Sequence, residues 1–155
     1  MSGILDLVRH HAVRHFAAGD VVLDQGARSG LLLVLLHGQV AVLRDEVPVA
    51  RSGQPGEMFG EMSVLLNVPH TATVRALTQA SFAVIENPRQ FLHDSPRASL
   101  HLAELLASRL DALNKYLIDV KRQYEGHDHL GMVDEILEAL MHRQRTVPAR
   151  QGSPA

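Results

Sequence analysis

The residues with the clearest chemical potential lie between Pro55 and Val74, in the stretch PGEMFGEMSVLLNVPHTATV. Glycine tolerates positive φ angles and lets a backbone approach a ligand closely, so N–H groups from Gly60 onward could point at an oxyanion. The apolar run that follows predicts one or two helical turns, whose free N-terminal N–H groups also favour an anion. Glu61, an acceptor only when ionised, could accept hydrogen bonds from sugar hydroxyls. The stretch therefore suits a small ligand that carries a phosphate and a ribose.

The same stretch resembles the phosphate-binding cassette of the cyclic-nucleotide-binding domain family. The family pattern reads Phe-Gly-Glu, a few apolar residues, then Pro-Arg-Thr/Ser/Ala-Ala-x-Val. The matching residues are Phe59, Gly60, Glu61, Pro69, Thr71, Ala72 and Val74. The resemblance implies that Glu61 contacts the ribose, and that the Thr71 hydroxyl and the Ala72 N–H contact the phosphate. The ligand-binding residues expected from it are Phe59, Gly60, Glu61, Met62, His70, Thr71, Ala72 and Asn114.

One position departs from the family pattern, because His70 stands where the family has its phosphate-binding arginine. A guanidinium is permanently charged and offers two parallel donors to phosphate oxygens, whereas an imidazole offers one and is charged only in part near neutral pH. Loss of a charge-assisted hydrogen bond costs about 1.5–3 kcal/mol, about ten- to a hundredfold in affinity. We therefore expect His70 to weaken nucleotide binding and to make it pH-dependent. A solvated loop position is the alternative for this side chain.

The composition is that of one soluble globular domain, with 155 residues, a formal net charge of −2 and 46% hydrophobic residues. Lysine and arginine number 15 against 17 acidic residues and do not cluster, which argues against a nucleic-acid surface. The absence of cysteine excludes disulfides and cysteine nucleophiles. The longest purely apolar run, 31–36, is far shorter than the roughly 20 residues of a membrane helix, and no secretory signal is visible. A cytoplasmic protein is expected.

Short apolar runs separated by glycine-containing turns predict a mainly β fold. Such strands at 8–12-residue spacing favour a sandwich or barrel over a βαβ sheet. The expected fold is an antiparallel jelly-roll β-barrel (double-stranded β-helix) of about eight strands, flanked by helices. The glycine turns also resemble the opening of the family's β-rolls, so that the resemblance covers residues 15 to 125. The expected strands are 21–23, 31–36, 40–43, 47–50, 72–76 and 81–85.

Helical patterns precede and follow the strands, at 4–11, 89–93, 97–125 and 130–141. The helix over 97–125 carries apolar residues at alternating steps of three and four, the period of a coiled-coil seam. We expect this helix to pair with a second copy of the chain, although packing against the β-roll is the alternative; family members often dimerise along it. The expected division is a β-roll with its long helix, 1–126, and an extra amphipathic helix with a flexible tail, 127–155. The seam residues are Ala103, Leu106, Leu110, Leu113, Leu117, Val120 and Tyr124.

The resemblance implies a regulatory sensor rather than an enzyme. Its ligand would be cyclic AMP, the common bacterial ligand of such folds, or cyclic GMP, and binding would reposition the long helix. Only about 30 residues follow Gly126, too few for a winged DNA-binding domain, so an unidentified effector protein is the expected partner. Asn114 lies where the family's helix approaches the purine, but an exposed position beside the seam is the alternative.

The sequence leaves two other functions open. In the first, a cassette that has lost its arginine no longer binds nucleotide and serves as a dimerisation or docking module. A metal-dependent enzyme of the cupin type is a remote third, because the ten histidines form only the pairs His10-His11 and His127-x-His129, and His37 stands alone. A zinc site needs three or four convergent ligands. No metal site is therefore expected, and Arg75 is expected to be solvated rather than to replace the missing arginine.

Overall fold

The computed structural model of the chain describes residues 3–124 and 135–141. The chain forms two compact units, Met1–Leu106 and Ala107–Ala155. The division falls inside the long helix α4 (Pro96–Gln123). The domain boundary expected at residue 126 lies outside the described residues. The β-roll and the start of α4 make up the first unit.

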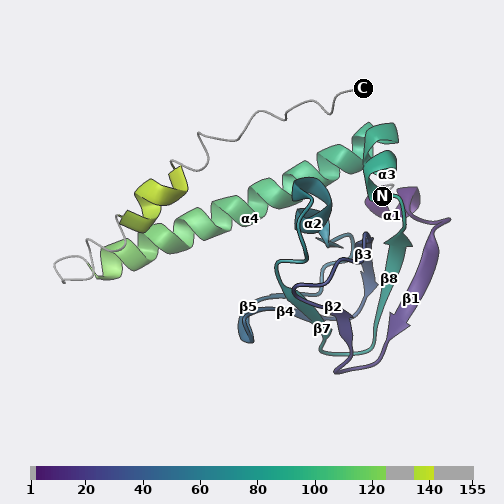
Figure 1. The fold of residues 1–155 in the computed structure, drawn as a ribbon, viewed down its shortest axis with the longest axis horizontal. Coiled ribbons are helices and arrows are strands. Elements are labelled where there is room, and N and C mark those ends of the chain that lie inside the picture. Colours follow the sequence, from purple (N-terminus) through teal and green to yellow (C-terminus); the bar gives the residue numbers. More distant parts are fainter. Residues whose placement is uncertain (1–2, 125–134, 142–155) are drawn as a thin grey trace. The chain divides into compact units, whose positions relative to one another are not determined.

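Two four-stranded antiparallel sheets form the body of the first unit (Figure 1). One sheet has the order β1-β8-β3-β6 and the other the order β2-β7-β4-β5. The eight strands of residues 3–124 confirm the predicted jelly-roll arrangement, as two packed sheets that do not close into one barrel. Their bounds are β1 (Ala12–Phe16), β2 (Val21–Leu23), β3 (Leu32–His37), β4 (Val40–Arg44), β5 (Val47–Ser52), β6 (Met58–Phe59), β7 (Thr73–Ala76) and β8 (Ala80–Ile85).

Strand β8 shows how the fold uses both faces of one sheet, because side chains of a strand alternate between faces. Phe82 and Val84 point into the cluster between the two sheets, together with residues such as Leu33 and Val74. Every residue of β8 is buried, which matches its central position in the sheet.

Helices cover the other face of the same sheet. Ala83 and Ile85 of β8 pack there with apolar residues of α1 (Ile4–Leu7), α3 (Pro88–Asp94) and the first turns of α4. Ser95 caps α4 as expected, since the N–H of Ala98 donates to the Ser95 hydroxyl over 3.2 Å and Pro96 takes the first helical position. The helices therefore close one end of this face.

The second unit contains the remainder of α4 and a helical segment over residues 135–141. The predicted seam residues Leu110 and Leu113 are 44% and 49% exposed. The expected helix stop at Gly126 and the part of the predicted helix 130–141 that precedes residue 135 lie outside the described residues. No helix in the described part of the chain has the length and apolarity needed to cross a membrane.

Candidate functional site

Gly60 of the predicted cassette cannot be replaced by another residue without backbone strain. Gly60 has φ +87° and precedes the short helix α2 (Glu61–Leu66). A Cβ atom added there would lie 2.5 Å from the carbonyl oxygen of Leu31, a backbone atom. Asn67, directly after α2, is also left-handed, with φ 54°. Glycine at position 60 thus lets the backbone turn sharply beside Leu31 and start α2 at Glu61.

The residues around Gly60 divide between core and surface. The Phe59 ring belongs to the core between the sheets, where it meets Phe82 edge-on at a centroid distance of 6.0 Å. Glu61, the first residue of α2, has a buried side chain that is 8% exposed, whereas Met62 is exposed. A carboxylate this deeply buried is uncommon, and its contact with a ligand stays a prediction.

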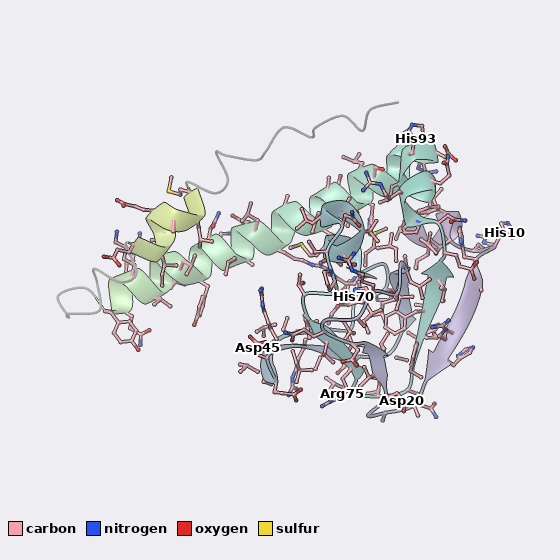
Figure 2. All side chains as sticks on the ribbon, in the orientation of Figure 1. His10, Asp20, Asp45, His70, Arg75 and His93 are labelled. Atoms are coloured by element: carbon pink, nitrogen blue, oxygen red, sulfur yellow. The ribbon has the colours of Figure 1, made fainter. Side chains whose placement is uncertain are left out.

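His70 lies in the loop between α2 and β7, and it is 5% exposed. Two backbone hydrogen bonds hold it against the loop between β2 and β3: its N–H donates to the carbonyl of Ala27 over 2.9 Å, and its carbonyl accepts the N–H of Gly26 at 2.9 Å. Its ring Nε2 lies 2.7 Å from the Ser29 Oγ. Figure 2 shows the side chain beneath α2, among the strands. The alternative of a solvated loop residue is therefore wrong.

Burial determines the charge of this ring. Desolvation lowers the pKa of His70 from its ordinary value of 6.5. The Ser29 Oγ already accepts the N–H of Leu31 over 3.2 Å, so its own hydroxyl proton is available to Nε2. This arrangement is satisfied by a neutral imidazole that keeps its proton on Nδ1. At neutral pH the cassette thus carries no fixed charge at the position of the family arginine.

The loop that covers His70 is anchored at Gln25. Its N–H donates to the Thr73 Oγ1 over 3.0 Å, and its side-chain amide exchanges two hydrogen bonds with Asp45, of 2.8 and 2.9 Å. Asp45 and Glu46 form the turn of the β4–β5 hairpin, both at positive φ. The cover over His70 is thus tied to β7 and to the hairpin.

The other predicted site residues are placed in different ways. Thr71 and Ala72 are half-buried and lead from His70 into β7. Asn114 is exposed on α4 in the second unit, so its contact with a ligand stays a prediction. Arg75 is half-buried on β7, next to Ala76, whose backbone bonds to the Gly19–Asp20 turn. It therefore lies at the end of β7 away from His70, and Figure 2 shows the two residues apart.

Sequence reasoning missed Ser29, the residue that engages the His70 ring. Ser29 is 41 positions away from His70 and falls outside the cassette pattern. The only feature of the sequence that pointed to Ser29 was its position in the loop after the predicted strand at 21–23. Within residues 3–124 and 135–141, no three His, Cys, Asp or Glu side chains gather as a metal site.

The two-sheet β-roll and its glycine–glutamate cassette define a class of ligand-binding domains. The family model of the cyclic nucleotide-binding domain matches residues 13–92, just over half of the chain. The chain therefore belongs to the cyclic nucleotide-binding domain family. This family and fold are those of regulatory domains rather than of enzymes.

Individual relatives agree with this placement. A catabolite activator protein of Thermus thermophilus superposes with a TM-score of 0.62 at 22% identity, over 91% of this chain and 83% of that one. A CRP-like cAMP-activated global transcriptional regulator of Mycobacterium tuberculosis is 27% identical over 77% of this chain and 56% of its own length. An uncharacterized ABC transporter ATP-binding protein of the same organism is 32% identical over 43% of this chain. The chain matches 22% of that relative's length.

Proposed function

We propose that this chain is a sensor domain that binds a cyclic nucleotide, with cyclic AMP as the expected ligand and cyclic GMP as the competitor. Family membership supports the ligand class, and a relative named as cAMP-activated supports the base. Glu61 would accept hydrogen bonds from the ribose, and the Thr71 hydroxyl and Ala72 N–H would donate to the phosphate. Gly60, Met62 and Asn114 would complete the contacts, and Phe59 would support them from the core.

One observation carries the proposal. The predicted ribose and phosphate positions are ten residues apart in sequence, but a Cβ atom at Gly60 would lie only 3.5 Å from Cε1 of His70. The backbone that leads into Glu61 thus lies beside the ring of the residue that replaces the family arginine. This closeness supports one small ligand for both positions, as a cyclic phosphate fused to a ribose would require.

The neutral state of His70 makes the proposed sensor a weak one at neutral pH. Protonation of the imidazole would add a positive charge beside the phosphate, so affinity should rise as the pH falls. The output would be a shift in the position of α4 and its pairing with a second copy of the chain, read by an effector protein. Support for pairing is the exposed apolar seam of the second unit.

A second function is favoured by the contact of His70 with Ser29. A neutral, buried ring whose Nε2 is already bonded within the chain has little left to offer a phosphate. In this alternative the cassette binds no nucleotide, and the domain serves in dimerisation and docking. The two functions differ in one measurable property, the affinity for cyclic nucleotides.

The test is calorimetric titration of cyclic AMP and cyclic GMP into the wild-type chain and two variants, at pH 6 and pH 8. His70→Arg restores the family arginine, and Glu61→Gln removes the carboxylate expected to contact the ribose. His93→Arg is the matched control, since it adds the same charge at an exposed position of α3. Circular dichroism melting of each variant confirms folding.

If the chain is a sensor, the wild type should bind cyclic nucleotide more tightly at pH 6 than at pH 8. His70→Arg should raise the affinity about ten- to a hundredfold, and Glu61→Gln should lower it. His93→Arg should leave the affinity unchanged. Binding by His70→Arg alone would support the docking module, because the pocket would then be intact but unused. No binding by any folded variant would refute the sensor.

A further inference from the structure

Two histidines that the sequence leaves unrelated share one row of the β1-β8-β3 sheet. Ser81 of the central strand β8 pairs with His15 of β1 on one side and with His37 of β3 on the other. Directly paired residues of adjacent strands point to the same face of a sheet. The row His15–Ser81–His37 therefore presents two imidazoles with a hydroxyl between them.

A bulge in β3 creates this row. Leu35 pairs with Phe82 and His37 pairs with Ser81, so that the register shifts by one residue between them. Leu36 is the extra residue, and it packs against the cluster under the helices. Bulges redirect side chains in this way. Without the bulge, Leu36 rather than His37 would lie opposite Ser81.

The row lies on the outer face of the sheet, outside the core between the sheets. Ser81 shares its face of β8 with Ala83 and Ile85, which α1, α3 and α4 cover. The row lies beyond that covered end and lines an open cleft of about 590 Å³. His15 and His37 are the titratable side chains that line the cleft, whose other lining residues are Phe16, Ala17, Gln79, Ala80 and Ser81.

Both rings have their nitrogens available. Three other histidines of the first unit are engaged in hydrogen bonds: His70 with Ser29, His93 with Asp94, and His101 with the carbonyl of Gly56. Within residues 3–124 and 135–141, no hydrogen bond or ion pair engages the side chain of His15 or His37, and both are exposed. Two unengaged imidazoles that face one cleft are the donor set of a borderline transition-metal ion.

We propose that this cleft is a metal-binding site, in which His15 and His37 coordinate one borderline divalent ion such as Zn²⁺, Ni²⁺ or Cu²⁺. Their Cα atoms are about 10 Å apart, twice the ~4.8 Å spacing of strands. Each imidazole then has to span about 5 Å to the middle strand, which a histidine and a metal–nitrogen bond of about 2 Å can do. Water completes the coordination, and the Ser81 hydroxyl lies beneath the ion.

This site is an open one, since the described residues provide no group of three His, Cys, Asp or Glu ligands. Three protein ligands and an open position are typical of catalytic zinc sites, so two ligands predict a weaker, exchangeable ion. The proposal does not depend on nucleotide binding. Its residues lie on β1, β3 and β8, whereas the cassette residues Glu61 and His70 belong to α2 and the loop after it.

The test is calorimetric titration of Zn²⁺ into the chelator-treated full chain and into His15→Gln, His37→Gln and His93→Gln. His93→Gln is the control, because it removes an exposed histidine of α3 that does not line the cleft. The strongest Zn²⁺ binding event should weaken by at least about tenfold in His15→Gln and in His37→Gln, because loss of even an outer-shell partner of a metal ligand costs 10–100-fold. His93→Gln should bind as the wild type does.

Paramagnetic broadening gives an independent measurement of location. Substoichiometric Cu²⁺ should broaden the amide signals of residues 15, 37 and 81 first in the nitrogen–proton correlation spectrum of the wild-type chain. Broadening centred on another histidine pair, such as His10-His11, would overturn the proposal. So would a strongest Zn²⁺ event that survives in both His15→Gln and His37→Gln.

Discussion

The hydroxyl oxygen of Ser29 lies 2.7 Å from Nε2 of His70 and joins two loops that are 41 residues apart. One loop leads from β2 to β3, and the other leads from α2 to β7. The same loops are also paired through the backbone of Gly26, Ala27 and His70. The imidazole at the position of the family arginine is thus part of the internal structure of the β-roll.

Ser29→Ala should destabilise the chain by about 1–3 kcal/mol, because it leaves a buried polar nitrogen without its partner. Chemical denaturation followed by circular dichroism measures the free energy of unfolding. Ser108→Ala is the control, as Ser108 is exposed on α4, and it should change the free energy by less than about 0.5 kcal/mol. Equal effects of the two substitutions would show that the contact with His70 contributes nothing.

The stability of the chain should fall as the pH is lowered through the titration of His70. Burial lowers the pKa of this ring below 6.5, so the unfolded chain binds more protons than the folded chain between the two pKa values. The stabilisation is complete above about pH 6.5 and is lost as the pH falls from there through the folded-state pKa. Denaturation of the wild type and of His70→Gln between pH 4.5 and 8.5 isolates this contribution. A stability difference between them that does not change with pH would contradict it.

Gly60→Ala should cost more stability than Gly19→Ala, although both glycines have φ near +90°. A Cβ at Gly19 meets no atom within 4 Å, so that substitution carries only the backbone strain, about 1–2 kcal/mol. At Gly60 the added Cβ also displaces the Leu31 carbonyl, and we expect about 3 kcal/mol or more in total. Urea denaturation midpoints compare the two variants. Similar midpoints would mean that Leu31 moves aside freely.

If α4 mediates a homodimer, Leu113→Glu should produce a monomer. Leu113 lies on the predicted seam, and a charge buried in a coiled-coil seam opposes pairing. Ile118→Glu is the matched control, since Ile118 is also exposed on α4, at 47%, but lies off the seam. Size-exclusion chromatography with light scattering gives the mass of each variant. A wild-type chain that is already monomeric at high concentration would refute pairing.

The sequence was sufficient where a local pattern determines the structure. All six expected strands are present, as are the short helix before Asp94 and the start of α4 at Pro96. Strand β1 was not expected because it is an edge strand whose residues are largely exposed, so it lacks an apolar signal. Strand β6, with two residues, is too short for any periodicity.

The site was less predictable than the fold because its key contacts are long-range. The cassette pattern located Gly60 and Glu61 at the start of a helix, as the structure has them. The partner of His70 depends on how the β2–β3 loop folds over the cassette, which no local pattern records. The placement of His15 and His37 on either side of Ser81 likewise requires three strands and the bulge at Leu36.

Helix α2 is bounded by a left-handed residue at each end, Gly60 before it and Asn67 after it. Neither residue can join the helix without a reversal of its φ angle, so α2 cannot extend past either of them. In the proposed sensor, ligand contact at Glu61 would therefore move a segment whose length cannot increase, and the change in backbone angles would fall on the two residues that bound it.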